Sequence, residues 1–162
     1  MMIDSRPPSG RMSRYGMPIG QPTAPAPVLV IDDDPVGSSS TMALLAAGGY
    51  TTAAESHGDS VLRLVRSEVM RLVVAELYIA CAEGRCVIAA LKQDRSRLPR
   101  LRVLAYSRHV TPADDDWALA AGADAVLHKP ARGSVLLREV HRLDGRGQLE
   151  PQPVFGGDGS RS

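Results

Sequence analysis

The sequence has few aromatic residues, only two cysteines and no long apolar segment. Aromatic side chains make up 4% of the 162 residues. Cys81 and Cys86 lack a second pair that could complete a zinc site or a disulfide framework, so we expect reduced thiols in a cytoplasmic protein. No apolar run approaches the roughly 18 residues that a transmembrane helix requires, and residues 1–15 lack the apolar core of a signal peptide.

Neither positive nor negative charge is in clear excess. The formal net charge is +1, which argues against a general affinity for nucleic acid or for membrane surfaces. The histidines show no metal-ligand spacing; they are His57, His109, His128 and His141. The hydrophobic content is 44%, which is enough to form the packed core of one domain.

Composition divides the chain into three parts. Residues 1–27 are rich in proline, glycine, serine and arginine, and we expect a disordered N-terminal tail there. Residues 144–162 resemble them, and we expect a second disordered tail. Because neither tail resembles an effector domain, the sequence predicts a stand-alone protein with one folded domain at residues 28–143.

Within that domain, short apolar runs alternate with amphipathic segments. We expect strands at residues 28–31, 50–54, 71–76, 101–106 and 123–128. Helices are expected at about residues 35–47, 59–67, 84–93, 112–121 and 132–143. This order predicts an α/β fold with a doubly wound, five-stranded parallel sheet and helices on both faces. Ligands in such folds bind beyond the carboxyl ends of the strands.

Polar residues follow four of these strands. Asp32 and Asp33 end the first strand, Glu76 ends the third, Ser107 follows the fourth and Lys129 follows the fifth. Because the carboxyl ends of parallel strands meet at one edge of a sheet, we expect these side chains to converge in an acidic pocket.

Several segments resemble the receiver domains of response regulators over residues 28–143. They are the opening Val28–Pro35 (VLVIDDDP), Gly84 in the loop after Glu76, Ser107, and the segment Gly122–Pro130 (GADAVLHKP). The resemblance implies a flavodoxin-like sheet with strand order 2-1-3-4-5. It also implies a cytoplasmic, non-enzymatic signalling protein of a two-component phosphorelay. Its expected partners are proteins, either a histidine kinase or a downstream signalling protein, and not nucleic acid or membrane.

The family's chemistry gives each polar residue an expected role. In receiver domains, an aspartate at the end of the third strand is phosphorylated. Glu76 occupies the equivalent position in this chain. The resemblance implies that Asp32, Asp33 and the backbone carbonyl of Tyr78 are placed to hold Mg²⁺. Ser107 and Lys129 are the equivalents of the residues that bind the transferred phosphoryl group.

The chain departs from the family pattern at the centre of this site. Glu76 replaces aspartate, and its additional methylene group carries the carboxylate toward Lys129, where an ion pair can form without phosphate. Ala80 stands where the family usually has proline, and Val126 where many members have tyrosine or phenylalanine. We therefore predict a pseudo-receiver in which Glu76 is a fixed mimic of the phosphorylated state and Mg²⁺ binding is weak or lost.

Two alternatives remain open. In the first, the chain is a working Mg²⁺-dependent receiver, and Glu76 or another carboxylate of the pocket accepts phosphate from a histidine kinase. In the second, the chain is a flavodoxin-like small-molecule binder that uses the same crevice. The second is disfavoured because the segment Asp32–Pro35 is acidic and offers no glycine-rich phosphate loop.

Overall fold

Ten helices and strands alternate along the described part of the chain. The structure is a computed structural model that describes residues 27–67, 70–81, 86–94, 99–108 and 111–145. The strands are β1 (Val28–Ile31), β2 (Thr52–Glu55), β3 (Leu72–Ala75), β4 (Arg102–Ser107) and β5 (Ala125–His128). The helices are α1 (Pro35–Ala47), α2 (Gly58–Ser67), α3 (Val87–Asp94), α4 (Pro112–Ala121) and α5 (Gly133–Leu143). The predicted tails and Gly84 lie outside the described residues, apart from the few tail residues nearest the domain.

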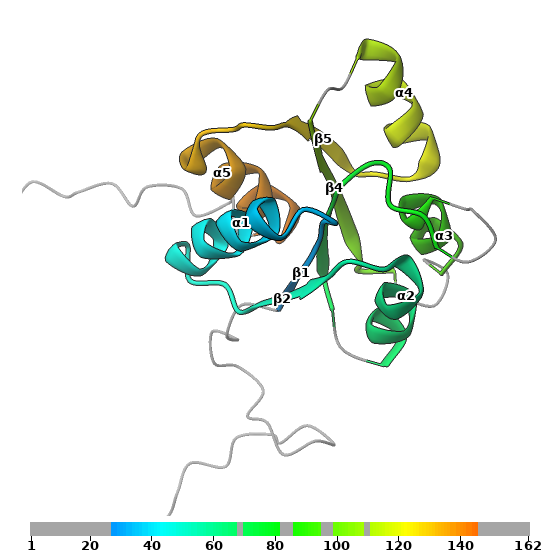
Figure 1. Cartoon of the computed structure of the whole chain (residues 1–162), viewed down its shortest axis with the longest axis horizontal. Helices are drawn as coiled ribbons and strands as arrows, with labels where there is room; N and C mark the ends of the chain where they lie inside the picture. The colour runs from blue at the N-terminus through cyan, green and yellow to red at the C-terminus, as the bar shows by residue number, and fades with distance from the viewer. Residues whose placement is uncertain (1–26, 68–69, 82–85, 95–98, 109–110, 146–162) are drawn as a thin grey trace, which may run out of the picture.

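The five strands form one parallel sheet in the order β2-β1-β3-β4-β5. Helices α1 and α5 cover one face of the sheet, and α2, α3 and α4 cover the other (Figure 1). The predicted doubly wound fold and its strand order are therefore confirmed. The order reverses between β1 and β3, which places a crevice at the carboxyl ends of these two strands.

Alternation along the three central strands explains why the sheet is buried on both sides. Leu29 and Val73 belong to the apolar cluster under α2, α3 and α4. Their chain neighbours Val28 and Leu72 belong to the cluster under α1 and α5. Each central strand therefore contributes to both layers of the core, and its carboxyl end is held in a fixed position.

Two helices begin at the signals that the sequence carries. Asp34 is the N-cap of α1, where its side chain accepts a hydrogen bond from the amide of Val36 at 3.1 Å. Helix α4 begins with a capping box, in which Thr111 and Asp114 each accept a hydrogen bond from the other's backbone amide. Proline follows both caps, at Pro35 and Pro112, where its fixed φ suits the first helical turn.

Two strands begin two residues later than the sequence predicts, and the other strand boundaries agree with the prediction to within one residue. Strand β2 begins at Thr52 instead of Tyr50, because the Tyr50 amide donates to the carbonyl of Leu45 and completes the turn after α1. Strand β5 begins at Ala125, after Asp124, whose carboxylate accepts a hydrogen bond from the amide of Val103 at 2.7 Å and whose own amide donates to the carbonyl of Val103 at 2.8 Å. In the described ranges, each helix is too short or too polar to cross a lipid bilayer.

Candidate functional site

Backbone hydrogen bonds set the positions of the polar residues at the strand ends. The Glu76 amide donates to the carbonyl of Ile31 at 2.8 Å, which places Glu76 beside the start of the acidic segment at Asp32. The Lys129 amide donates to the carbonyl of Ser107, also at 2.8 Å. The parallel ladder therefore continues one residue beyond the strands and brings their side chains to one edge of the sheet.

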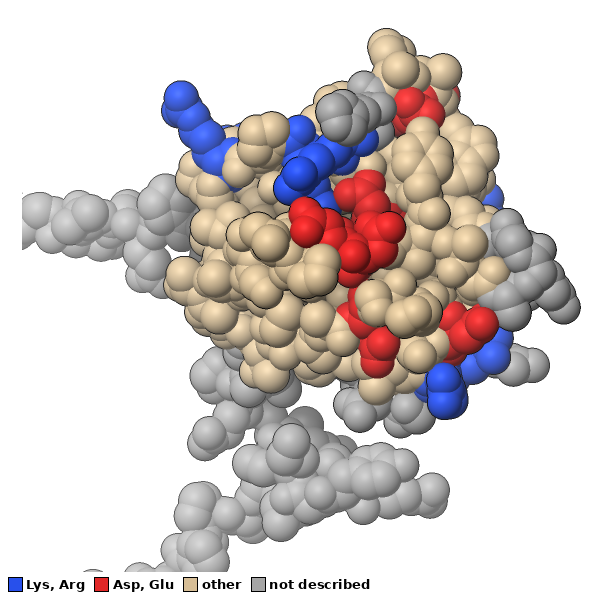
Figure 2. Space-filling model, in the orientation of Figure 1, with Lys and Arg blue, Asp and Glu red and all other residues tan. Residues whose placement is uncertain are grey.

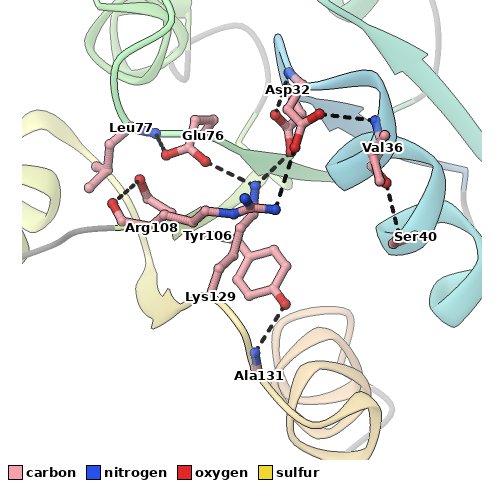
Figure 3. Close-up of polar contacts among 11 residues, drawn as sticks. Asp32, Val36, Ser40, Glu76, Leu77, Tyr106, Arg108, Lys129 and Ala131 are labelled. Carbon is pink, nitrogen blue, oxygen red and sulfur yellow. Dashed lines mark hydrogen bonds and ion pairs between the residues drawn. The ribbon is translucent and has the colours of Figure 1, made fainter.

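Lys129 forms the centre of the site. Its Nζ atom lies 2.6 Å from Oδ2 of Asp32 and 2.9 Å from Oε2 of Glu76. Figure 3 shows the ammonium group between the two carboxylates. The Lys129 side chain is 7% exposed, so this double ion pair is largely removed from water and is screened less than a surface pair.

The second oxygen of each carboxylate is also occupied. Oδ1 of Asp32 accepts the amide of Asp34 at 2.9 Å, and Oε1 of Glu76 accepts the amide of Leu77 at 3.1 Å. Each carboxylate is thus held at two points, once by Lys129 and once by the backbone that follows its strand. This satisfies the requirement that buried charges be paired and hydrogen-bonded.

Two opposing effects act on the ammonium group of Lys129. Burial by itself lowers its pKa, but the hydrogen bonds and charges of Asp32 and Glu76 outweigh that effect, so the pKa of Lys129 is raised. The Nζ atom also lies 5.2 Å from the centroid of the Tyr106 ring, within the range of a cation–π contact. Lys129 is therefore a charged lysine at neutral pH.

An outer ion pair lies next to this cluster. Nη2 of Arg108 is 3.4 Å from Oδ2 of Asp34, and both side chains are about half exposed. Arg108 reaches toward the carboxylates from the loop after β4 (Figure 3), and Figure 2 shows acidic side chains gathered beside basic ones on this face. Neither Arg108 nor Tyr106 was predicted from the sequence to belong to the site. The one sequence feature that indicated a place for Tyr106 in the site is its position next to Ser107. No sequence feature indicated that Arg108 belongs to the site.

Three residues predicted for the site lie outside the Lys129 cluster. Ser107 is fully buried at the end of β4, but its hydroxyl donates to the carbonyl of Arg108 at 3.2 Å. Asp33 is exposed. The Tyr78 side chain points away and donates to Asp114 at 2.6 Å. Among the described residues, no recorded contact joins Asp33 or the Tyr78 carbonyl to the cluster.

The resemblance to receiver domains implies a Mg²⁺ ion at this site, so the fit of this ion can be tested against the residues present. Mg²⁺ needs an octahedral set of oxygen ligands. Here one oxygen of Asp32 and one of Glu76 point to Lys129, and the others accept backbone amides. The described part of the chain contains no group of three acidic, histidine or cysteine side chains that could hold a metal. As arranged, these residues form an ion-pair cluster that does not fit the metal.

A cavity of about 560 Å³ adjoins the cluster on the side of α1. Its walls come from α1, the end of β4 and the segment after β5, and they include Leu44, Tyr106, Arg108, Lys129 and Pro130. The volume lies in the range of small-molecule pockets, and the residues that line the cavity include Lys129 but neither Asp32 nor Glu76.

Comparison with known proteins decides the family. The family model of the response regulator receiver domain matches residues 28–141, which is more than half of the chain. The chain belongs to the response regulator receiver domain family. It is therefore a signalling domain of the two-component type, as the segments at the strand ends suggested.

Relatives of this receiver domain include transcriptional regulators. It is 30% identical over 147 residues to the transcriptional activator protein ExaE of Pseudomonas putida, covering 83% of this chain and 67% of ExaE. It is 33% identical over 103 residues to the transcriptional regulatory protein ZraR of Escherichia coli, covering 64% of this chain. The match spans only 23% of the length of ZraR.

Solved structures show the same fold. A CheY-like receiver domain from Methanospirillum hungatei superimposes with a TM-score of 0.64 at 21% identity, covering 75% of this chain and 95% of that one. The structure of NtrX from Brucella abortus matches with a TM-score of 0.66 at 22% identity, covering 76% of this chain and 28% of NtrX. At these identities the likeness concerns the fold.

Proposed function

We propose that this receiver domain signals through protein contact, with Glu76 held against Lys129 as a fixed substitute for a phosphorylated aspartate. The observation that carries the proposal is the position of the Lys129 ammonium, 2.6 Å from Asp32 and 2.9 Å from Glu76. In this arrangement the lysine already neutralises the carboxylate at the acceptor position. The carboxylate at the acceptor position therefore has a cationic partner without a phosphoryl group, and it shares the single charge of Lys129 with Asp32.

The geometry of Glu76 supports a fixed state. A carboxylate nucleophile must present a free oxygen to the phosphorus atom in a near-attack position, and a displacement of about 1 Å can cost on the order of a hundredfold in rate. Both oxygens of Glu76 accept hydrogen bonds, one from Lys129 and one from the Leu77 amide. Attack would require Glu76 to break the contact with a buried ammonium group, which raises the barrier further.

The position of Ser107 agrees with the same proposal. In the family this hydroxyl is expected to bond the phosphoryl group after transfer, and here it donates to the carbonyl of Arg108. Val126 stands where many members of the family have tyrosine or phenylalanine, so no aromatic ring at this position can follow a movement of Ser107. We infer that the usual phosphorylation-dependent movement is not how this domain changes its output surface.

Protein partners are the expected targets. The surface that the family resemblance suggests is formed by α4, β5 and α5, and α4 exposes Trp117 and Leu119 on it. Candidates are a histidine kinase or a downstream signalling protein. Control of transcription, which the names of ExaE and ZraR describe for those relatives, would reach this chain only downstream of such contacts.

Intact-mass measurement tests the proposal. The protein is incubated with acetyl phosphate and Mg²⁺, and the wild type is compared with Glu76→Gln and Glu76→Asp. We expect no stoichiometric adduct on the wild type, since Glu76 stays bound to Lys129. A phosphoryl adduct on the wild type that disappears in Glu76→Gln would overturn the proposal and support the alternative of a working phosphorelay receiver. Glu76→Asp reports whether the shorter carboxylate restores the chemistry.

A further inference from the structure

The first turn of α4 receives side-chain bonds from two distant segments of the chain. The Tyr78 hydroxyl donates to Oδ1 of Asp114 at 2.6 Å, and Nε2 of His128 lies 2.9 Å from Oδ1 of Asp115. Tyr78 comes two residues after Glu76, and His128 comes directly before Lys129. The two segments that carry the Glu76–Lys129 ion pair therefore both reach the same turn of one helix.

Asp114 links its bond with Tyr78 to the start of the helix. Oδ2 of Asp114 accepts the Thr111 amide at 2.7 Å and the Thr111 hydroxyl at 2.8 Å, which leaves Oδ1 for Tyr78. The hydrogen bond to Asp114 raises the pKa of Tyr78, and the same bond lowers the pKa of Asp114. The phenol is thus attached by a charge-assisted bond to the cap of α4 and not to a freely moving side chain.

Packing alone does little to hold α4. Ala118 is the one residue of this helix that is buried, whereas Trp117 is 43% exposed and Leu119 is 49% exposed. A helix that buries so little apolar surface gains little from tertiary packing. Its placement then depends more on side-chain bonds such as those of Asp114 and Asp115.

We propose that Tyr78 and His128 are positioning residues that connect the Glu76–Lys129 pair to the first turn of α4. When the pair is intact, both strand ends are held, and the two bonds hold the exposed face of α4 in one placement for a protein partner. When the pair is broken, the ends of β3 and β5 gain freedom and α4 moves with them. This inference rests on the proposed function because it takes the Glu76–Lys129 pair as the controlling contact.

The only tryptophan of the chain provides the reporter, because Trp117 lies on α4. We would record the indole resonance of Trp117 and the amide exchange of α4 by NMR. In the otherwise unmodified protein, Glu76→Gln weakens the pair and is expected to shift the indole resonance and to raise exchange in the first turn of α4 about fivefold, the factor for one lost hydrogen bond. In the Tyr78→Phe/His128→Gln background, Glu76→Gln is expected to add no further change.

Matched variants separate this coupling from a general loss of structure. Asp114→Asn and Asp115→Asn each remove one partner and should each reduce the response to Glu76→Gln. Asp116→Asn removes the same charge at the next position of α4, but Asp116 takes part in neither bond, so the response should stay intact. Dispersed spectra outside α4 show that each variant is folded.

Two outcomes would overturn the inference. One is a response to Glu76→Gln of unchanged size in the Tyr78→Phe/His128→Gln background, and the other is no response in the otherwise unmodified protein. A phosphoryl adduct on Glu76 in the mass experiment would overturn the proposed function instead and would leave this coupling measurable. The two failures are therefore distinguishable.

Discussion

At the scale of single residues, Lys129 determines the charge balance of the strand-end cluster. It is the one cation that contacts both Asp32 and Glu76 among the described residues, and its side chain is 7% exposed. Removing one partner of a buried ion pair costs more than the pair itself contributes, because the remaining charges stay buried without compensation. Loss of the lysine should therefore lower the stability of the domain. The loss of stability should be smaller when one of the two carboxylates is neutralised in the same variant.

Lys129→Ala is expected to lower the free energy of unfolding by about 3 kcal/mol, since it leaves Asp32 and Glu76 facing each other. Glu76→Gln added to that variant should recover part of the loss, because it removes one of the two uncompensated charges. Urea denaturation of both variants measures the two values. Lys92→Ala is the control, because Lys92 is exposed and its one hydrogen bond within the described residues goes to the carbonyl of Ala120. Equal stability of Lys129→Ala and the wild type would contradict the contact.

The raised pKa of Lys129 predicts how stability changes at alkaline pH. A group whose pKa is higher in the folded state binds its proton more tightly there, so its contribution is complete below the ordinary lysine pKa of about 10.4. That contribution is lost as the pH rises through the raised pKa of the folded state. We expect the stability difference between the wild type and Lys129→Met to be constant from about pH 7 to 9 and to shrink above pH 10.4. Thermal melts across this range measure the difference, and one that grows with pH would contradict the assignment.

At the scale of elements, α1 approaches the cluster so closely that it needs a glycine. A Cβ atom at Gly37 would lie 2.9 Å from Oδ2 of Asp32, the oxygen that contacts Lys129, and 3.1 Å from Oδ2 of Asp34. The helix and the ion-pair cluster are therefore packed against each other. Sequence propensity alone gives no sign of this, because glycine inside a helix is merely unfavourable.

Gly37→Ala tests that packing. Alanine gains about 1 kcal/mol over glycine inside a helix, yet the added methyl group would push the Asp32 carboxylate away from Lys129. We expect the displacement of the Asp32 carboxylate to outweigh the gain in helix propensity, so the melting temperature should fall. Ser39→Ala on the exposed side of α1 is the control and should change it little. A higher melting temperature for Gly37→Ala would show that the Asp32 carboxylate can move without loss.

At the scale of the whole molecule, alternation of apolar runs was sufficient to predict the sheet and both helical layers. The four strand ends were identifiable because each apolar run stops at a polar residue, and this gave Asp32, Glu76 and Lys129 before their contacts were known. The orientation of Ser107, the exposure of Asp33 and the bond between Tyr78 and Asp114 were not predictable. These depend on side-chain rotamers and loop geometry, which carry no periodic signal.

We propose that the cluster at the strand ends is complete without metal or phosphate. The most direct test is to record the amide spectrum of the domain before and after adding Mg²⁺ together with beryllofluoride, a phosphoryl mimic. Because Lys129 already holds Asp32 and Glu76, we predict that the amide resonances of Asp34, Leu77 and the first turn of α4 stay where they are. Saturable shifts of these resonances at millimolar Mg²⁺ would contradict the claim and show a pocket that still opens for the phosphoryl group.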